Sequence, residues 1–435
     1  MSVARVHDLS SSADYIRRAG RLIPFGVSSS KRATQQPTPV VIDRAEGSRV
    51  FDIAGNEYLD YAAGAGPMLL GHRPVAVLDA VRAQLDRGWQ YAAAHEGELE
   101  LAERVVRAVP CAEMVTFLSS GSEAVHCAVG IARGATRRRR VLKFDGQFDG
   151  WMAPVAANMP GSPPVEGRAP FEVKPVAGWH ADDLVVCPWN DVDALEEVMA
   201  QFGPSLAAVI MEAVACNAGS LFPSGGYLER VRELCDRHGT VLIFDEVITG
   251  FRLALGGAQA RVRVTPDLAT FAKAMANGFP ISAVAGRREV MSVASDGPVR
   301  TRGTYNGNPL SVAAANATLA ELERRAGELY PELERRSADL AEGLLDAAAA
   351  TGAPLRVNRA GSVVGLFWGL DREPTCYREV AGSDVGSLKR LEKELVLRGI
   401  NTIDGERMFV SAAHTDGDIT ATVETFREAL HALIG

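Results

Sequence analysis

The sequence predicts an α/β protein whose large domain contains a mostly parallel, seven-stranded sheet. Short apolar runs alternate with helical segments from about residue 98 to residue 310, which is typical of a parallel sheet covered on both faces. Each run is long enough for a buried strand and too short for a helix. The expected strands are Val115–Leu118, Val141–Phe144, Leu184–Val186, Ala207–Met211, Val241–Phe244, Leu268–Ala272 and Ile281–Ala285.

The large domain is expected to span residues 66–310, and two of its helices follow directly from the pattern. One runs from about Pro74 to Arg87. The other, Tyr227–His238, has its apolar residues on one face, and Gly239 marks its end. The stretch 152–180 is rich in Pro, Gly and Ala without a clean period, and a loop of that length is usually functional or mobile.

Residues 1–65 and 311–435 are expected to form the N-terminal and C-terminal parts of a smaller α+β domain. The first part contains a short helix and an antiparallel meander, and the second begins with a long Ala-rich helix. The expected elements are a helix at Tyr15–Arg18, strands at Val40–Ile42, Val50–Ile53, Val363–Phe367 and Met408–Ser411, and helices at Val385–Arg398 and from Asp416.

Composition excludes several classes of function. The formal net charge of -8 argues against a general affinity for nucleic acid or acidic membranes, and the basic run Arg137–Arg140 is interpreted as a solvated loop. The six cysteines show no CxxC spacing, so neither a metal site nor a disulfide framework is expected. Met1–Ser12 is polar and contains no apolar h-region, so no signal peptide is expected. The longest apolar stretch, Leu206–Cys216, is too short to span a bilayer, so a cytoplasmic protein is expected.

Two charged residues stand at the ends of predicted strands. The run Val241–Phe244 ends in Asp245, and the run Leu268–Ala272 ends in Lys273. Ligands of open α/β sheets bind in the crevice outside the carboxyl ends of the strands, so we expect both groups in one site. Taken alone, each has an ordinary explanation, since such an Asp is often a cap and a lone Lys is usually solvated.

The pair favours pyridoxal phosphate chemistry. A lysine beside apolar walls loses its charge readily and can form a Schiff base with an aldehyde. A buried carboxylate beside a pyridine nitrogen keeps that nitrogen protonated, which lets the ring withdraw electrons. Lys273 and Asp245 are therefore the candidate catalytic residues.

An anion site is predicted where the strand Val115–Leu118 runs into a helix at Ser119–Ala124. Gly121 lets the backbone approach an oxyanion, the free amides of a helix N-terminus bind it, and Ser120 and Ser122 add hydroxyl donors. The alternative is an ordinary N-cap, since Ser-x-x-Glu openings are common. No GxGxxG follows a strand and no Walker lysine is present, which argues against a nucleotide cofactor.

Four motifs resemble those of the class III aminotransferases and occur in the family's order. They are Ser119–Ala124, Phe244–Arg252, Lys273 with Asn277–Gly278, and Gly303–Leu310. The resemblance extends from Gly26 to His414, and its closest branch is that of glutamate-1-semialdehyde 2,1-aminomutase. It implies a fold-type I homodimer that uses pyridoxal 5'-phosphate and acts on small-molecule amines and carbonyls.

The resemblance also implies roles for individual residues. Lys273 becomes the Schiff-base lysine and Asp245 the partner of the pyridine nitrogen. Gly121 and Ser122 would hold the phosphate, and Thr304 would reach it from the other subunit of the dimer.

The remaining roles concern the cofactor ring and the substrate. Phe148 takes the position of the aromatic ring that stacks on the cofactor. The family usually has Tyr followed by His here, whereas this chain has Phe148 followed by Asp149, so stacking is kept and a hydroxyl is lost. Ser29 and Arg32 match a segment that grips a substrate carboxylate, for which Arg is well suited, and Glu406 matches an acid close to the lysine. A surface arginine and a solvated acid are the alternatives.

The departures from the aminomutase pattern lie on the substrate side. The tryptophan usual at the position of Ala65 is missing, Trp89–His95 lacks the Ser-Phe-Gly-type sequence, and 152–180 is unlike the aminomutase gating loop. We infer that the cofactor machinery is intact and that the substrate has changed.

The sequence therefore predicts an aminotransferase that moves an amino group between a primary amine and a carbonyl acceptor, in a specialised biosynthetic pathway for an amino acid or amino sugar. A mutase that moves the amine within one molecule, or an epimerase with the same proton transfer, is the alternative among enzymes. A catalytically silent binding protein of the same fold is the alternative of another class, opposed by the presence of Lys273 and Asp245.

Overall fold

The computed structural model describes residues 6–162 and 183–434. The chain divides into two units. The small unit comprises Met1–Pro74, Glu328–Glu373 and Gly382–Gly435, and the large unit comprises Val75–Gly327 and Pro374–Ala381. The sequence alone predicts domain boundaries at residues 65 and 310, whereas these units change over at Pro74 and Gly327. Residues 163–180 of the predicted long loop lie outside the described residues.

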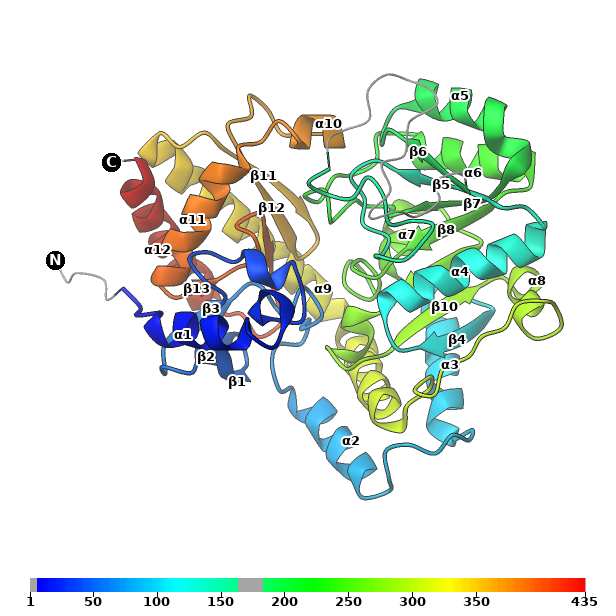
Figure 1. The fold of residues 1–435 in the computed structure, drawn as a ribbon, viewed down its shortest axis with the longest axis horizontal. Coiled ribbons are helices and arrows are strands. Elements are labelled where there is room, and N and C mark those ends of the chain that lie inside the picture. The colour runs from blue at the N-terminus through cyan, green and yellow to red at the C-terminus, as the bar shows by residue number, and fades with distance from the viewer. Residues whose placement is uncertain (1–5, 163–182, 435) are drawn as a thin grey trace. The chain divides into compact units, whose positions relative to one another are not determined.

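The large unit is built on the predicted seven-stranded sheet (Figure 1). Its strands are β4 (Met114–Leu118), β5 (Arg140–Phe144), β6 (Leu184–Cys187), β7 (Leu206–Met211), β8 (Val241–Asp245), β9 (Leu268–Phe271) and β10 (Ser282–Gly286). Each expected strand matches an observed one to within one residue at either end. The order is β4-β10-β9-β8-β7-β5-β6; β10 is antiparallel to both neighbours and the remaining pairs are parallel.

Helices pack on the faces of this sheet. The helix α4 (Gly121–Thr136) crosses β7, β8, β9 and β10, and α6 (Tyr227–His238), at the predicted bounds, packs on β8. The other helices that contribute to the large unit are α2 (Val75–Leu85), α3 (Glu96–Ala108), α5 (Val192–Phe202), α7 (Gly257–Val262), α8 (Arg288–Met291), α10 (Tyr377–Val380), the first part of α9 (Pro309–Thr351), and the 3-10 turns η4 (Gly203–Ser205), η5 (Lys273–Ala276) and η6 (Ser292–Ala294).

The central strands explain why the sequence is so apolar here. Every residue of β7, β8 and β9 is buried, because neighbouring strands cover both edges and helices cover the faces. The three strands are parallel, so their carboxyl ends lie at the same edge of the sheet. Residues that follow these ends are therefore brought together.

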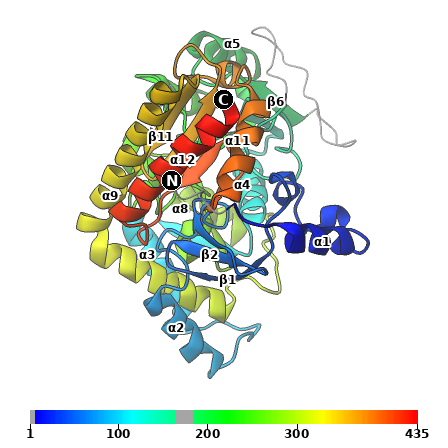
Figure 2. The ribbon, with the colours of Figure 1, turned by 90° about the vertical axis from the view of Figure 1, so that its left-hand side faces the viewer.

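The small unit combines N-terminal and C-terminal segments, as predicted. One sheet has the order β1-β2-β3-β13 and the other β11-β12-β14. Their strands are β1 (Ile42–Glu46), β2 (Arg49–Asp52), β3 (Glu57–Asp60), β11 (Leu355–Ala360), β12 (Val363–Trp368), β13 (Ile400–Asn401) and β14 (Arg407–Phe409). The helices are α1 (Ser10–Ala19), the 3-10 turns η1 (Pro24–Gly26) and η2 (Arg32–Thr34), the end of α9, α11 (Val385–Leu397) and α12 (Asp416–Ile434). Figure 2 shows α11 and α12 side by side.

No helix among the described residues combines the length and apolar character that a membrane span requires.

Candidate functional site

Two predicted catalytic residues meet at the carboxyl edge of the large sheet. Asp245 ends β8, and Lys273 follows the adjacent strand β9. Their side chains line one cavity of about 210 Å³. Four other predicted residues line the same cavity: Ser120, Gly121, Ser122 and Phe148.

Asp245 is buried, and the described part of the chain binds one of its two carboxyl oxygens. Its Oδ1 accepts hydrogen bonds from the backbone N–H of Val247 at 2.9 Å and from the hydroxyl of Thr270 at 3.2 Å. Burial raises the pKa of the Asp245 carboxyl well above its usual range, and the charge of Asp149 raises that pKa further. Among the described residues both bonds end on Oδ1, which leaves Oδ2 for a donor in the cavity. A cationic N–H donor there would stabilise the ionised carboxylate.

Lys273 has an uncommon backbone conformation. Its φ is 46°, in the left-handed region that non-glycine residues rarely adopt. The residue opens η5 two positions after the end of the buried strand β9, and the next three residues, Ala274, Met275 and Ala276, are all buried. Strain of this kind persists where the surrounding structure fixes it, often at functional sites. The buried segment therefore holds the lysine at the cavity wall.

The start of α4 is compatible with both interpretations of its sequence, an ordinary N-cap and an anion site. The Oγ of Ser120 accepts the N–H of Glu123 at 3.3 Å, and Oε2 of Glu123 accepts the N–H of Ser120 at 2.8 Å. This is the ordinary capping box. The amides of Gly121 and Ser122 belong to the first turn, which has no acceptors within its own helix, and both residues line the cavity. An anion can therefore bind where the helix is already capped.

Phe148 forms part of the cavity wall beside an acid that the sequence analysis did not select. The N–H of Phe148 donates to Oε1 of Glu212 at 3.0 Å, and the side-chain amide of Asn217 donates to the same oxygen at 3.0 Å. Glu212 lines the cavity, and burial raises its pKa. It directly follows β7, just as Asp245 ends β8. Glu212 could have been selected from the sequence by the same pattern as Asp245, a carboxylate at the end of an apolar run.

Thr304 lines a different cavity of the large unit, with a volume of about 400 Å³. The residue is exposed, and its carbonyl accepts a hydrogen bond from the side-chain amide of Gln90. Thr304 is not among the residues that line the Lys273 cavity. Its expected contact with the site of a neighbouring subunit stays a prediction.

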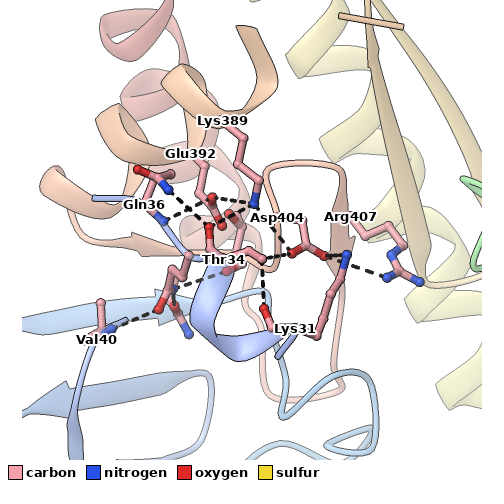
Figure 3. Close-up of polar contacts among 11 residues, drawn as sticks. Lys31, Thr34, Gln36, Val40, Lys389, Glu392, Asp404 and Arg407 are labelled. Atoms are coloured by element: carbon pink, nitrogen blue, oxygen red, sulfur yellow. Dashed lines mark hydrogen bonds and ion pairs between the residues drawn. The ribbon is translucent and has the colours of Figure 1, made fainter. Parts of the chain in front are cut away.

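The predicted substrate residues Ser29, Arg32 and Glu406 belong to the small unit. Arg32 is exposed, whereas Ser29 and Glu406 are half-buried. Nζ of Lys31 lies 2.5 Å from Oδ2 of the buried Asp404 (Figure 3). This ion pair joins the segment that carries Ser29 and Arg32 to the loop that precedes Glu406, so the two nominated segments are neighbours within the unit.

The groups in the large-unit cavity fit pyridoxal phosphate. Lys273 supplies an amine, Asp245 supplies a buried carboxylate with one available oxygen, and the first turn of α4 can receive a phosphate. This site on a seven-stranded, mostly parallel sheet defines a pyridoxal-phosphate-dependent enzyme of fold type I.

The chain belongs to the class III aminotransferase family, whose sequence profile matches residues 30–425. Glutamate-1-semialdehyde 2,1-aminomutase 2 of Brevibacillus brevis is 39% identical over 424 residues, which cover 96% of this chain and 98% of the relative. The glutamate-1-semialdehyde 2,1-aminomutase of Alkaliphilus oremlandii is 40% identical over 427 residues, which cover 97% and 99%. The crystal structure of an omega-transaminase from Sphaerobacter thermophilus superposes with a TM-score of 0.91 at 30% identity, covering 98% of each chain. The predicted family, enzyme class and cofactor are confirmed.

Proposed function

We propose that the protein is an aminotransferase that moves an amino group between a primary amine donor and a carbonyl acceptor. The observation that carries the proposal is that Lys273 and Asp245 line one cavity at the carboxyl edge of the sheet. Amine transfer needs an amine that can exchange protons and a carboxylate that can balance a charged ring nitrogen. The likeness to an omega-transaminase over 98% of the chain supports this function.

Pyridoxal phosphate, when bound, supplies an aldehyde that captures amines and a ring that accepts electrons from the neighbouring carbon. Nζ of Lys273 would hold the cofactor and would be released when an amine binds. The released Nζ would act first as a base, accepting the proton of the substrate carbon, and then as an acid that returns a proton. Oδ2 of Asp245 would accept a hydrogen bond from a protonated ring nitrogen.

The other lining residues position the cofactor. In the proposal, the first-turn amides and hydroxyls at Ser120, Gly121 and Ser122 bind the phosphate, which suits the positive end of a helix dipole. Phe148 packs its ring on the pyridine ring. Because Phe148 has no hydroxyl, it orients the ring through contact alone.

We further propose a homodimer in which Thr304 contributes to the neighbouring site. Trp89 is 62% exposed and Tyr305 is 66% exposed, and large exposed aromatic side chains are typical of a surface that another chain covers. Thr304, next to Tyr305, lines a cavity without Lys273.

Subunit mixing tests this arrangement. A hybrid of Lys273→Ala and Thr304→Ala chains contains one site with both native residues, so mixing the two inactive or weakened proteins should restore activity and tight cofactor binding in about half of the hybrid's sites. Mixing that restores nothing, although the chains exchange, contradicts the contribution in trans.

On the substrate side we propose Ser29, Arg32 and Glu406, with Arg32 binding a carboxylate. A guanidinium binds a carboxylate through two parallel hydrogen bonds. Arg32→Ala should lower kcat/KM for carboxylated amines about tenfold or more and leave amines without a carboxylate unchanged. Arg21→Ala, at an exposed residue of the same N-terminal segment, is the matched control. Equal losses on both kinds of amine would remove the proposed contact.

A half-reaction screen tests the main proposal. Candidate amines are mixed with the cofactor-bound protein, and conversion of the cofactor to its pyridoxamine form is followed by absorbance. A transaminase releases a free carbonyl product and keeps the amino group until an acceptor is added. Lys273→Ala should abolish the conversion while the protein stays folded. A wild-type protein that takes up no added cofactor would contradict every enzymatic proposal.

Intramolecular amine transfer is the second candidate, supported by 39% and 40% identity to the two aminomutases over nearly the whole chain. A mutase keeps the substrate in its site, so no free carbonyl accumulates. Conversion of glutamate-1-semialdehyde to the isomer with its amine on C1, without release of a carbonyl product, would favour this candidate. The departures at Ala65 and Trp89–His95 favour the transaminase.

A further inference from the structure

A fully buried ion pair lies next to the cavity wall. Nζ of Lys143, in β5, lies 3.3 Å from Oδ2 of Asp149, and neither side chain is exposed. Nζ also donates hydrogen bonds to the backbone carbonyls of Gln147, Val155 and Ala157, at 2.9, 3.1 and 2.9 Å. Three carbonyls match the three N–H donors of an ammonium group, which is what a buried lysine cation requires.

Asp149 is bound in a different way. Neither of its oxygens accepts a hydrogen bond in the described part of the chain. An acid that only held this loop in place would accept amide hydrogen bonds, as Glu212 does from Phe148. Burial raises the pKa of Asp149, and the charge of Lys143 opposes that effect. The carboxylate therefore depends on the ammonium group rather than on hydrogen bonds.

The position of Asp149 relates it to the site. Phe148 and Gly150, its chain neighbours, both line the Lys273 cavity. The N–H of Phe148, the residue before Asp149, donates to Oε1 of Glu212 at 3.0 Å, and Glu212 and Asp245 line the same cavity, so Asp149 lies beside both carboxyl groups. In agreement, the charge of Asp149 raises the pKa of Asp245 and that of Glu212. Lys143, Asp149, Glu212 and Asp245 thus form a buried cluster of ionisable side chains beside the cavity, with Lys273 on its wall.

We propose that Lys143 and Asp149 are positioning residues that set the charge beside Asp245: Lys143 keeps Asp149 ionised, and Asp149 adds a second negative charge next to Asp245, so that the cofactor's ring nitrogen keeps its proton to higher pH. The inference rests on the proposed role of Asp245. A protonated ring withdraws electrons more strongly, so the pair supports the reaction without touching the cofactor. The family usually has His at this position, so the added negative charge is a property of this chain.

The test uses the full-length, cofactor-loaded protein with a 15N label at the ring nitrogen. The 15N chemical shift reports the protonation of that atom directly and needs no turnover. Asp149→Asn should release the ring proton about one pH unit below the wild type, the size of effect expected from one nearby charge. Asp267→Asn is the matched control, because Asp267 is another buried acid of this unit, 2.9 Å from Arg232. In the Asp267→Asn variant, the ring nitrogen should release its proton at the same pH as in the wild type.

A second variant keeps the test valid if Asp149→Asn fails to fold. Lys143→Met combined with Asp149→Leu removes both charges and leaves no unpaired ion in the interior, a change that folded proteins tolerate. It should shift the titration of the ring nitrogen in the same direction as Asp149→Asn but by less, because the Lys143 cation is removed together with the carboxylate. If Asp149→Asn and the double variant both hold the proton over the same pH range as the wild type, the proposal is overturned. Asp245→Asn distinguishes a failure of this inference from a failure of the proposed role of Asp245. If Asp245→Asn lowers the pH at which the ring nitrogen releases its proton and the Asp149 variants do not, only this inference fails. If Asp245→Asn leaves that pH unchanged, the proposed role of Asp245 fails.

Discussion

The hydroxyl of Thr270 donates a hydrogen bond of 3.2 Å to Oδ1 of Asp245. The two residues are paired across β9 and β8, and Thr270 is fully buried. The N–H of Val247 binds the same oxygen at 2.9 Å. One oxygen of the carboxylate is thus fixed by the protein. Within residues 6–162 and 183–434 the other oxygen accepts no hydrogen bond, which is the arrangement that a single ring N–H requires.

Thr270→Val should therefore weaken cofactor binding. The substitution keeps the side-chain shape and removes one hydrogen bond to a buried charged group, which costs about 1–2 kcal/mol, or about fivefold to thirtyfold in the dissociation constant. Titration of the cofactor-free protein with pyridoxal phosphate measures the change. Thr270→Ser retains the hydroxyl and should bind almost as tightly as the wild type. Equal weakening in both variants would show that packing, rather than the hydrogen bond, is responsible.

The buried carboxyl of Asp245 should make the stability of the cofactor-free protein depend on pH. Burial raises the pKa of Asp245 well above its ordinary value of 3.8, so above that value the unfolded chain releases a proton that the folded chain keeps. The stability contributed by Asp245 is present below pH 3.8 and is lost as the pH rises through the raised pKa. Asp245→Asn cannot ionise and avoids this loss.

Urea unfolding of both proteins from about pH 5 to about pH 9 measures the effect. Without cofactor, Asp245→Asn should be the more stable protein at the alkaline end. With cofactor the order should reverse, because a ring N–H cation favours the ionised carboxylate. Parallel pH profiles of the two cofactor-free proteins would contradict the expectation.

Gly121 should be needed for close packing at the phosphate end. A β-carbon there would lie 3.0 Å from both Cγ atoms of Val247, tighter than ordinary contact, so either Val247 or the start of α4 must move. We expect Gly121→Ala to weaken cofactor binding about tenfold or more, because the first-turn amides would shift from the anion.

Gly130 offers a control in the same helix. A β-carbon on Gly130 meets nothing within 4 Å, so Gly130→Ala should leave cofactor affinity unchanged. It should also stabilise the protein by about 0.5–1 kcal/mol, since alanine is the better helix former. Affinity that is unaltered in Gly121→Ala would contradict the packing argument.

The sequence predicts the large sheet well because its signal is local. Central strands such as Val241–Asp245 are apolar throughout and end in polar residues, so their bounds can be read directly. The small unit is harder. Its first strand is Ile42–Glu46 rather than Val40–Ile42, because a polar strand at a sheet edge has no apolar run to mark it. The sequence analysis missed the strand Glu57–Asp60 because its charged and apolar residues alternate over only four positions and leave no apolar run.

The sequence predicts those residues of the site that a local motif marks, and it does not predict the contacts that depend on the folded path of a loop. Asp245 and Lys273 stand out because each follows an apolar run, and the structure brings them into one cavity. The hydrogen bonds of Lys143 could not be predicted from the sequence. Its acceptors are the backbone carbonyls of Gln147, Val155 and Ala157, whose positions depend on the path of an irregular loop. The ion pair that Lys143 makes with Asp149 depends on the same path.

Glu392 in α11 should control the stability of the small unit near neutral pH. Its side chain is fully buried, with Oε2 3.2 Å from Nζ of Lys389 and accepting the N–H of Gln36 at 3.2 Å (Figure 3). Burial raises the pKa of Glu392 to about 7; the charge of Asp404 adds to this, and Lys389 opposes it.

The sign of the pH dependence follows from that shift. The pKa rises from 4.5 to about 7, so the stability contributed by Glu392 is present below pH 4.5 and is lost as the pH rises through 7. The loss amounts to at most about 3 kcal/mol. Glu392→Gln keeps an oxygen for Gln36 and cannot ionise, so its free energy of unfolding should fall less than that of the wild type between about pH 5 and about pH 8. Glu394→Gln, on the same helix beside Arg398, is the control and should follow the wild-type profile. If Glu392→Gln and the wild type lose the same stability over this range, the ionisation of Glu392 is not what the profile reports.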